Sequence, residues 1–264
     1  MGGSPIDYDS VAEIYDLYVT ADYDVPFFVG EAERAEGPVL ELMAGTGRLS
    51  LPLVRAGVRL TCVDASATML AVLARKLEAE DLAAEVVRSD VCELALPDRY
   101  TLAVLPFQSF MEVVGEERQR RALASVHRCL APRGRFVVTL HNPTVRRAQV
   151  DGARREVCRC PLPDGGTLVV SGVESGGDPV VRRRQIFEFL GSDGDLRFTR
   201  ELAMEFALIG REEFDALARD AGFRVLDLVG DYDRSPFDAA RSPFLIWRLE
   251  KVDTEAGSIH RKSP

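Results

Sequence analysis

Residues 38–48, PVLELMAGTGR, contain the pattern from which the architecture of this chain can be predicted. A short apolar run ends in an acid there, and a glycine turn then leads into a helical pattern. A second apolar run, LTCV, ends in Asp64, seventeen residues after Gly47. Because glycine has no Cβ, the backbone of such a turn can approach a ligand closely. This strand–turn–helix–strand unit is typical of a nucleoside site, in which the second acid can accept both ribose hydroxyls.

The glycine turn differs from the G-x-G-x-x-G fingerprint of dinucleotide sites, in which a helix N-terminus faces a pyrophosphate. Ser50 stands at the third glycine position, and Glu41 lies just before the turn. A carboxylate is unfavourable beside a pyrophosphate and favourable beside a cationic ligand without phosphate, such as S-adenosylmethionine. The pattern therefore argues against a nicotinamide-dependent dehydrogenase.

At these residues the chain resembles the class I S-adenosylmethionine-dependent methyltransferases, whose first motif reads acid-x-Gly-x-Gly-x-Gly. Here the motif is Glu41-x-Met43-x-Gly45-x-Gly47, so Met43 departs from the family pattern. The resemblance covers residues 7–142 well and 211–251 more loosely. It implies an α/β fold with a doubly wound, mostly parallel, seven-stranded Rossmann-like sheet. It also implies S-adenosyl-L-methionine as cofactor and S-adenosyl-L-homocysteine as product.

The resemblance also indicates cofactor contacts at the ends of the strands. Asp90 would accept a hydrogen bond from the adenine amine, and the next backbone N–H would donate to the ring. Glu41 is expected either to pair with Arg48 or to join a network near the cofactor amine. The predicted cofactor-binding residues are Tyr8, Tyr15, Glu41, Ala44, Gly45, Thr46, Gly47, Asp64, Ala65, Met69, Asp90, Val91, Leu105 and Phe107.

Two side chains are candidates for the chemistry. His141 follows the fifth strand at the rim of the expected pocket, and an ordinary histidine pKa suits a general base. It could equally be a polar residue at a strand end. Tyr15 belongs to a Tyr-Asp pattern near the N-terminus and could act through water or lie beside the sulfonium. Gln108 and His141 are the expected substrate contacts, and no metal site is expected.

Alternating apolar patterns divide the chain into four parts. We expect N-terminal helices folded over the cofactor in residues 1–37 and a methyltransferase core in 38–142 and 211–251. We also expect an inserted antiparallel β lid in 143–210 and a disordered tail in 252–264. Asp24 and Ser66 are predicted N-caps, and Gly222 is a predicted C′ residue. The predicted helices are 7–18, 24–35, 47–56, 66–80, 116–130 and 211–221. The predicted strands are 38–42, 58–63, 84–88, 100–105, 135–140, 154–160, 167–173, 180–190, 195–208, 223–230 and 243–250.

Composition narrows the range of partners. The 264 residues include 42 acids and 33 bases, and the formal net charge is −9. An acidic surface repels phosphate backbones, so a nucleic-acid substrate is not expected. No apolar run could span a membrane, and the N-terminus has no signal-peptide core. Five scattered cysteines without zinc spacing indicate a reduced, cytoplasmic protein. The expected partner is a small-molecule acceptor, and a homodimer is left open.

The expected lid is similar to that of glycine and sugar-amine N-methyltransferases. We therefore predict methyl transfer to a small-molecule amine, such as an amino sugar or a similar natural-product intermediate. An O-methyltransferase is the nearest alternative, and a non-catalytic S-adenosylmethionine-binding regulator or partner subunit is an alternative of another class. The arginines at 182–184 are either solvated strand charges or a grip on an anionic group of the acceptor.

Overall fold

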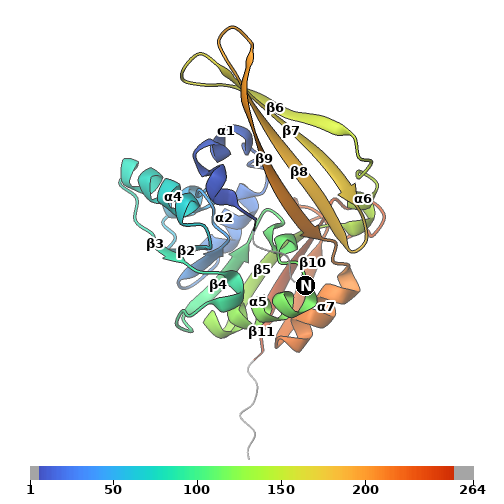
Figure 1. The fold of residues 1–264 in the computed structure, drawn as a ribbon. Helices are drawn as coiled ribbons and strands as arrows, with labels where there is room; N and C mark the ends of the chain where they lie inside the picture. The colour runs from blue at the N-terminus through green and yellow to red at the C-terminus, as the bar shows by residue number, and fades with distance from the viewer. Residues whose placement is uncertain (1–5, 253–264) are drawn as a thin grey trace, which may run out of the picture.

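A computed structural model describes residues 6–252 as a core built on a seven-stranded sheet, with a second sheet of four strands above it (Figure 1). The core strands are β1 (Val39–Leu42), β2 (Leu60–Asp64), β3 (Glu85–Arg88), β4 (Tyr100–Leu105), β5 (Leu130–His141), β10 (Phe223–Val229) and β11 (Phe244–Lys251). Their order is β10-β11-β5-β4-β1-β2-β3, and only β11 runs against its neighbours. The predicted doubly wound, mostly parallel sheet is confirmed. The carboxyl ends of its parallel strands meet at one edge, where such sheets bind ligands.

Alternate residues of the central strands pack on opposite faces of this sheet. Leu40 and Leu42 of β1 face the layer that contains α5 (Glu116–Cys129) and α7 (Arg211–Asp220). Val39 faces the other layer, which contains α2 (Val25–Glu33), α3 (Ser50–Arg55) and α4 (Ala67–Ala79). Helices therefore cover both faces, as a near-continuous apolar strand requires.

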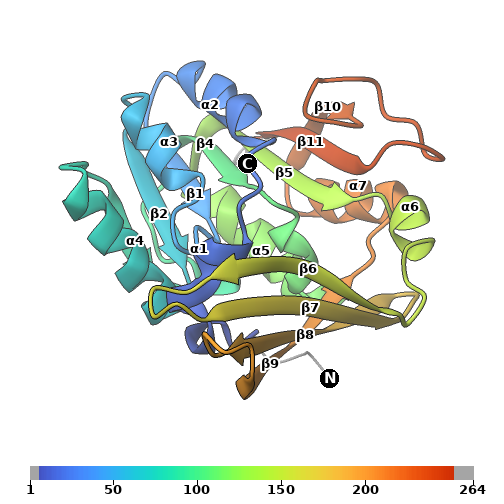
Figure 2. The same ribbon diagram turned by 90° about the horizontal axis from the view of Figure 1, so that it is seen from above.

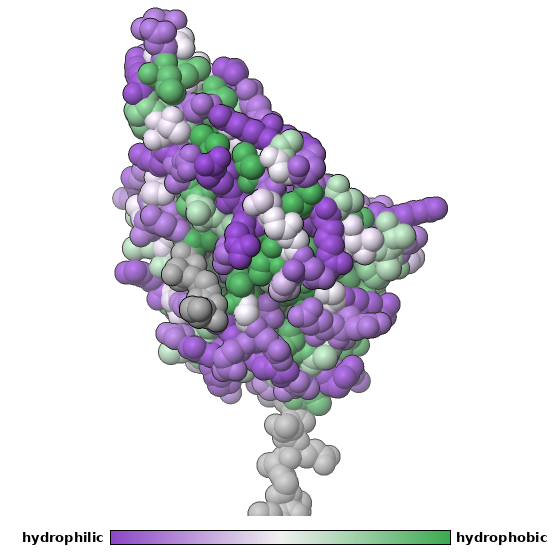
Figure 3. All heavy atoms as spheres, turned by 45° about the vertical axis from the view of Figure 1, so that its right-hand side comes forward, coloured by the Kyte–Doolittle hydropathy of each residue, from purple (hydrophilic) through white to green (hydrophobic). Residues whose placement is uncertain are grey.

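The second sheet is the antiparallel lid that the glycine-rich hairpins predict. Its strands are β6 (Arg154–Pro161), β7 (Thr167–Gly176), β8 (Val180–Leu190) and β9 (Leu196–Ala207), paired in chain order. The helix α6 (Pro143–Arg147) leads into it from β5. Polar residues cover most of the face drawn in Figure 3, and hydrophobic ones gather just below the tip of the lid. Leu196 and Phe198 are the exposed apolar residues of this part of the lid.

Residues 6–18 lie between the lid and the core, as Figures 1 and 2 show for the short helix α1 (Tyr15–Tyr18). The predicted continuous helix over 7–18 is wrong. The segment consists of two 3₁₀ turns, Tyr8–Ser10 and Ala12–Ile14, followed by α1. Val11 packs against the lid, whereas Ala12 packs against α4. Because apolar residues are needed on two opposite sides, the segment has no single stripe that would favour one helix.

Other helix boundaries follow the predicted local signals. The Ser66 hydroxyl accepts a hydrogen bond from the backbone N–H of Met69 at 3.0 Å, which confirms this N-cap. Gly222 follows Ala221, the C-cap of α7, and adopts φ of +88°, as its predicted C′ position requires. Asp24 stands at the N-cap of α2, but its side chain makes no capping hydrogen bond. The predicted disordered tail lies outside the described residues, apart from Val252. Among residues 6–252, no helix is both long and apolar enough to cross a bilayer.

Candidate active site

The turn after β1 contains three residues with left-handed backbone, Met43, Gly45 and Gly47, with φ of +55°, +57° and +88°. Met43 takes this conformation where the family pattern has glycine, at a strain of about 1–2 kcal/mol for a residue with a Cβ. Its side chain packs against the core and lines a cavity at the carboxyl ends of the strands. Sequence reasoning treated Met43 only as a departure from the motif and missed this contact.

The two glycines of the turn have different tasks. A Cβ on Gly45 would meet no atom within 4 Å, and Gly45 lines the cavity, so its backbone is open to a ligand. A Cβ on Gly47 would lie 2.3 Å from Cδ1 of Leu73 and 2.8 Å from Cδ1 of Leu51. Gly47 therefore allows the turn to pack on α4 and α3, and it is absent from the cavity lining.

This difference predicts that alanine at Gly47 mainly lowers stability, whereas alanine at Gly45 mainly weakens cofactor binding. Both positions carry left-handed strain of about 1–2 kcal/mol, but only Gly47→Ala also overpacks the core. We expect Gly47→Ala to lower the melting temperature by roughly 5–15 °C. We expect Gly45→Ala to remain much closer to wild type in stability while binding S-adenosylmethionine more weakly. Thermal unfolding and calorimetric titration of both variants measure the two effects, and equal losses of stability would contradict this assignment.

Asp64, at the end of β2, lies beside Gly45 in the wall of the cavity. Its Oδ2 accepts a hydrogen bond from the Gly45 N–H at 2.8 Å, and its Oδ1 accepts one from the Ser66 N–H at 2.8 Å. Burial raises the pKa of Asp64, while these backbone donors act in the opposite direction. The carboxylate is thus held in place by two backbone donors at the position where a ribose is bound in this type of fold.

Asp90 and Arg118 also line this cavity. Asp90 accepts a hydrogen bond from the backbone N–H of Cys92 at 2.8 Å and pairs with Arg118 at 3.0 Å. Burial alone would raise the pKa of Asp90, but the Cys92 N–H and the Arg118 charge outweigh it and lower the pKa. Asp90 is therefore a fixed carboxylate at the predicted adenine end.

Eight of the fourteen predicted cofactor-binding residues line this cavity, and six do not. Those on the cavity are Tyr8, Tyr15, Gly45, Asp64, Ala65, Met69, Asp90 and Val91. Ala44 and Leu105 are instead buried in the core, and Phe107 lines a neighbouring cavity. Lining residues that the sequence analysis missed are Ile6, Met43, Val63, Ser66, Ser89, Ser109, Glu112, Val113 and Arg118.

Glu41 does not reach the cavity, and it does not pair with Arg48. Because it follows Leu40, it faces the opposite side of β1, where the Ser50 hydroxyl of α3 donates to its Oε2 at 2.6 Å. Arg48 instead forms a two-fold ion pair with Asp24, at 2.5 and 2.7 Å. This pair engages the Asp24 side chain, which explains why it does not cap α2. Burial raises the pKa of Glu41 to about 8, with the Ser50 hydroxyl opposing the shift.

Glu41 should make the folding stability depend on pH. The folded protein keeps this carboxyl protonated up to pH about 8, whereas an unfolded glutamic acid loses its proton near pH ~4.3. Between these two pH values, unfolding releases the proton of Glu41. The free energy of unfolding therefore falls as the pH rises from the unfolded pKa to the folded pKa. We expect Glu41→Gln to become progressively more stable relative to wild type from pH 5 to 8. Denaturant unfolding at several pH values measures this difference, with exposed Glu78→Gln as a charge-matched control. Parallel curves for Glu41→Gln and wild type would contradict the raised pKa.

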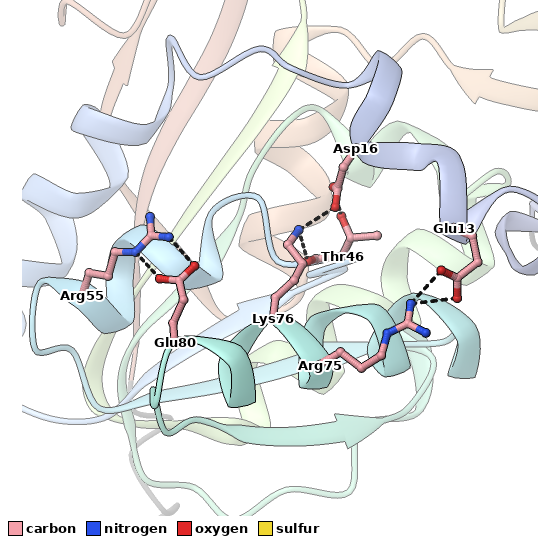
Figure 4. Close-up of polar contacts among 7 residues, drawn as sticks. All are labelled: Glu13, Asp16, Thr46, Arg55, Arg75, Lys76 and Glu80. Atoms are coloured by element: carbon pink, nitrogen blue, oxygen red, sulfur yellow. Dashed lines mark hydrogen bonds and ion pairs between the residues drawn. The ribbon is translucent and has the colours of Figure 1, made fainter. Parts of the chain in front are cut away.

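Acidic residues of the N-terminal segment fasten it to the glycine turn and to α4 (Figure 4). The Thr46 hydroxyl donates to Asp16 Oδ1 at 2.6 Å, and Lys76 Nζ reaches Asp16 Oδ2 at 2.7 Å and the Thr46 carbonyl at 2.8 Å. Arg75 pairs with Glu13 one turn away. Thr46 thus holds the segment over the turn and does not line the cofactor cavity. Each exposed pair contributes little, typically about 0–1 kcal/mol, but together they fix the register of the segment.

A second cavity opens beside the first, between the core and the lid. The lid contributes six lining residues from all four of its strands: Val157, Glu174, Arg183, Gln185, Met204 and Phe206. The two cavities share four lining residues, namely Tyr8, Tyr15, Ser109 and Glu112. Ligands in the two cavities could therefore both contact these four side chains.

Glu112 is the ionisable acid at this junction. The Tyr8 hydroxyl donates to its Oε1 at 2.9 Å, and no donor among residues 6–252 reaches its Oε2. Burial raises the pKa of Glu112 to about 8, against the Tyr8 hydrogen bond. A carboxyl with a strongly perturbed pKa in a cleft is a candidate for proton transfer. The signal available in the sequence was an acid within the apolar run FMEVV after the fourth strand.

The structure places His141 on the second cavity and on an opening that adjoins it, and not on the first cavity. Its ring stacks on Phe244, with centroids 5.5 Å apart. Burial lowers the pKa of His141 to about 4, and the nearby Arg146 charge adds to the shift. The imidazole is therefore neutral but a weak base. Tyr15 lines both cavities, yet burial raises its pKa far above neutrality, so its phenol keeps its proton.

Gln108 lies in the second cavity, as expected of a substrate contact. Its Nε2 donates to the Tyr232 hydroxyl at 2.9 Å, and its N–H donates to Thr139 Oγ1 at 3.1 Å. The preceding Phe107 lies under the Arg48 guanidinium, 4.3 Å from the ring centroid. Both residues have left-handed backbone, which turns the chain after β4 into the cavity wall.

The first cavity suits S-adenosylmethionine better than a dinucleotide. Its ionisable lining residues among those described are Asp64, Asp90 and Glu112 against Arg118 alone. Asp90 is paired with Arg118 and Glu112 is mostly protonated at pH 7, so the Asp64 carboxylate remains, which favours a cationic ligand over a pyrophosphate. The fixed Asp64 carboxylate faces the expected ribose position. The missing side chain at Gly45 leaves room for a ligand against the backbone. Asp64 and Asp90 would hold the adenosine, and Glu112 lies where the lining is shared with the second cavity.

Comparisons with known proteins identify the class of enzyme. Residues 39–134 match the family model described as a methyltransferase domain. The chain is 34% identical over 118 residues to demethylmenaquinone methyltransferase of Thermus thermophilus, covering 44% of this chain and only about half (52%) of that enzyme. It is 25% identical over 247 residues to the cypemycin N-terminal methyltransferase of a Streptomyces species, covering 92% of this chain and 97% of that protein.

Two solved structures share the fold over most of their length. The CcbJ methyltransferase from Streptomyces caelestis matches with a TM-score of 0.76 and 24% identity, covering 92% of this chain and 96% of that one. The sugar N-methyltransferase KedS8 from a Streptoalloteichus species matches with a TM-score of 0.74 and 18% identity, covering 95% of both chains. The fold and the cavity define a protein with a ligand site at the carboxyl ends of its parallel strands. Residues 39–134 form a methyltransferase domain, and the chain as a whole shares the fold of these solved methyltransferases.

Proposed function

We propose that this protein transfers the methyl group of S-adenosylmethionine to the nitrogen of a small-molecule amine held in the second cavity. The observation that carries the proposal is the position of Glu112, which lines both cavities and has a free carboxyl oxygen on the described part of the chain. Similarity to the cypemycin N-terminal methyltransferase and to the sugar N-methyltransferase KedS8 also supports nitrogen as the acceptor atom.

The residues around the junction can prepare an amine for reaction. When bound, S-adenosylmethionine supplies an electrophilic methyl carbon on a sulfonium. An alkyl amine arrives mostly protonated at neutral pH and must lose that proton before its lone pair can attack. Glu112 takes the proton on Oε2 while Tyr8 keeps Oε1 oriented. Tyr15, between the two cavities, restricts the position of the amine and excludes water, which favours in-line approach.

The charge of Glu112 must change on binding for this step to work. In the empty site its pKa of about 8 leaves it mostly protonated at pH 7. A sulfonium and an ammonium nearby both favour the carboxylate and lower the pKa. The Glu112 carboxylate therefore forms only when both ligands are present, and it then accepts the proton of the amine.

Cofactor turnover with matched panels of amines, alcohols and carboxylic acids tests the proposed function. We expect amines to be methylated, with the position of the new methyl group read by mass spectrometry and NMR. Turnover of alcohols alone would favour an O-methyltransferase. Cofactor binding without methylation of any acceptor would favour the non-catalytic regulator.

A further inference from the structure

The lid end of the second cavity contains a cluster of two arginines and one glutamate. Arg146 from α6 and Arg183 from β8 both approach the same oxygen of Glu174 on β7, at 2.5 and 3.1 Å. The side chains are mostly buried, with exposed fractions of 12% for Arg146, 15% for Glu174 and 25% for Arg183. All three line the cavity that Glu112 also lines.

The cluster has an unbalanced positive charge. Two guanidinium groups face one carboxylate, whose pKa is lowered because the two arginines outweigh its burial. His141 beside them is neutral and adds no charge. Arg155 and Glu156 line the adjoining opening, but they are matched by Asp151 and Arg159 respectively. The cluster therefore has one positive charge in excess, which an anionic ligand could neutralise.

Arg183 is directed into the cavity by its surroundings. Its neighbours Arg182 and Arg184 are exposed on the other side of β8 and pair with Glu205 and Glu201. Gly172 makes room for Arg183, since a Cβ there would lie 3.0 Å from its Nη2. The Nε of Arg183 is buried and has no hydrogen-bond acceptor among the described residues. An unsatisfied buried guanidinium donor is unfavourable until an acceptor reaches it.

We propose that Arg146 and Arg183 bind an oxyanion group, a carboxylate or a phosphate, on the acceptor molecule. The acceptor would lie along the cavity with its amine at Glu112 and its anionic group at the lid. This inference rests on the proposed amine methylation and adds the second charged group of the substrate. A guanidinium fork suits both oxyanions, because each can accept two parallel hydrogen bonds.

Matched acceptors test this inference with the whole 264-residue chain. We expect wild type to prefer an amino acid or an amino-sugar phosphate over its neutral amide or dephosphorylated counterpart by about 10- to 100-fold in kcat/KM. The preference should collapse in Arg183→Gln and be partly kept in Arg183→Lys, which retains the charge without the fork. Arg182→Gln, one residue away on the exposed side, should keep the wild-type preference. Which anionic amine gains most distinguishes a carboxylate from a phosphate.

A binding measurement separates failure of this inference from failure of the proposed function. In NMR titrations with the cofactor bound, acetate or inorganic phosphate should perturb wild type and Arg182→Gln but not Arg183→Gln. Amines methylated without any preference for anionic ones would overturn the oxyanion site and leave the proposed function standing. The absence of any amine turnover, together with anion binding lost in Arg183→Gln, would overturn the proposed function alone. Identical anion titrations of Arg182→Gln and Arg183→Gln would also overturn the oxyanion site.

Discussion

Glu112→Gln is expected to lower kcat for an amine acceptor by about 100- to 1,000-fold at pH 7, the range that a well-placed general base supplies. The amide has nearly the shape of the carboxyl and can still bond to Tyr8, but it cannot take a proton from an ammonium. Cofactor affinity should change much less, because Asp64 and Asp90 hold the adenosine. Steady-state kinetics and calorimetry with S-adenosylhomocysteine measure the two quantities.

The pH dependence makes this expectation specific. If Glu112 only removes a proton from the incoming amine, raising the pH toward the pKa of that amine supplies the free base from solution. The variant should then recover activity at high pH, whereas a variant with a damaged fold would not. Glu93 is an exposed acid at the end of the 3₁₀ turn Val91–Glu93. Glu93→Gln is therefore the charge-matched control and should keep wild-type turnover. Wild-type kcat in Glu112→Gln at pH 7 would refute the role.

The same assay tests whether Glu112 or His141 is the general base. Alanine at His141 should reduce turnover by less than about 10-fold, since its pKa of about 4 makes it a weak base. A larger loss for His141→Ala than for Glu112→Gln would indicate that His141 is the general base, as the sequence analysis expected.

The fold was predictable because its determinants are local. Apolar runs of strand length alternate with helical stripes from residue 38 to residue 141, and this alternation leaves a parallel sheet as the main solution. The lid strands were equally predictable from glycine-rich turns between Val- and Phe-rich runs. Asp64 and Asp90 were predictable from the same local pattern, because Asp64 ends β2 and Asp90 comes two residues after β3.

The remaining site features depend on packing that a sequence does not display. Gly45 and Gly47 have the same local pattern, and only the positions of Leu51 and Leu73 decide which one faces the ligand. Glu41 turns away because side chains alternate along β1. Glu112 becomes a junction residue only when residues 6–18 fold over it and Tyr8 donates to it across 104 positions of the chain.

Asp64→Asn is expected to weaken S-adenosylmethionine binding by about 100-fold, because two charge-assisted hydrogen bonds to the ribose would be lost or weakened. The substitution also disturbs the protein itself. The Gly45 and Ser66 N–H groups each donate to a different oxygen of Asp64, and an asparagine has only one. One of these N–H groups would face the amide NH₂, so the glycine turn should loosen and the melting temperature should fall.

A pair of ligands separates these two effects. Methylthioadenosine has both ribose hydroxyls, and its 2′,3′-dideoxy analogue has neither. If Asp64 binds the ribose, calorimetry should show a loss of about 100-fold for methylthioadenosine and a much smaller loss for the dideoxy analogue. Glu78→Gln, an exposed substitution of the same charge on α4, should leave both affinities at wild-type values. Equal losses for the two ligands would mean that Asp64 acts only by shaping the turn, and the ribose contact would then have to come from another residue.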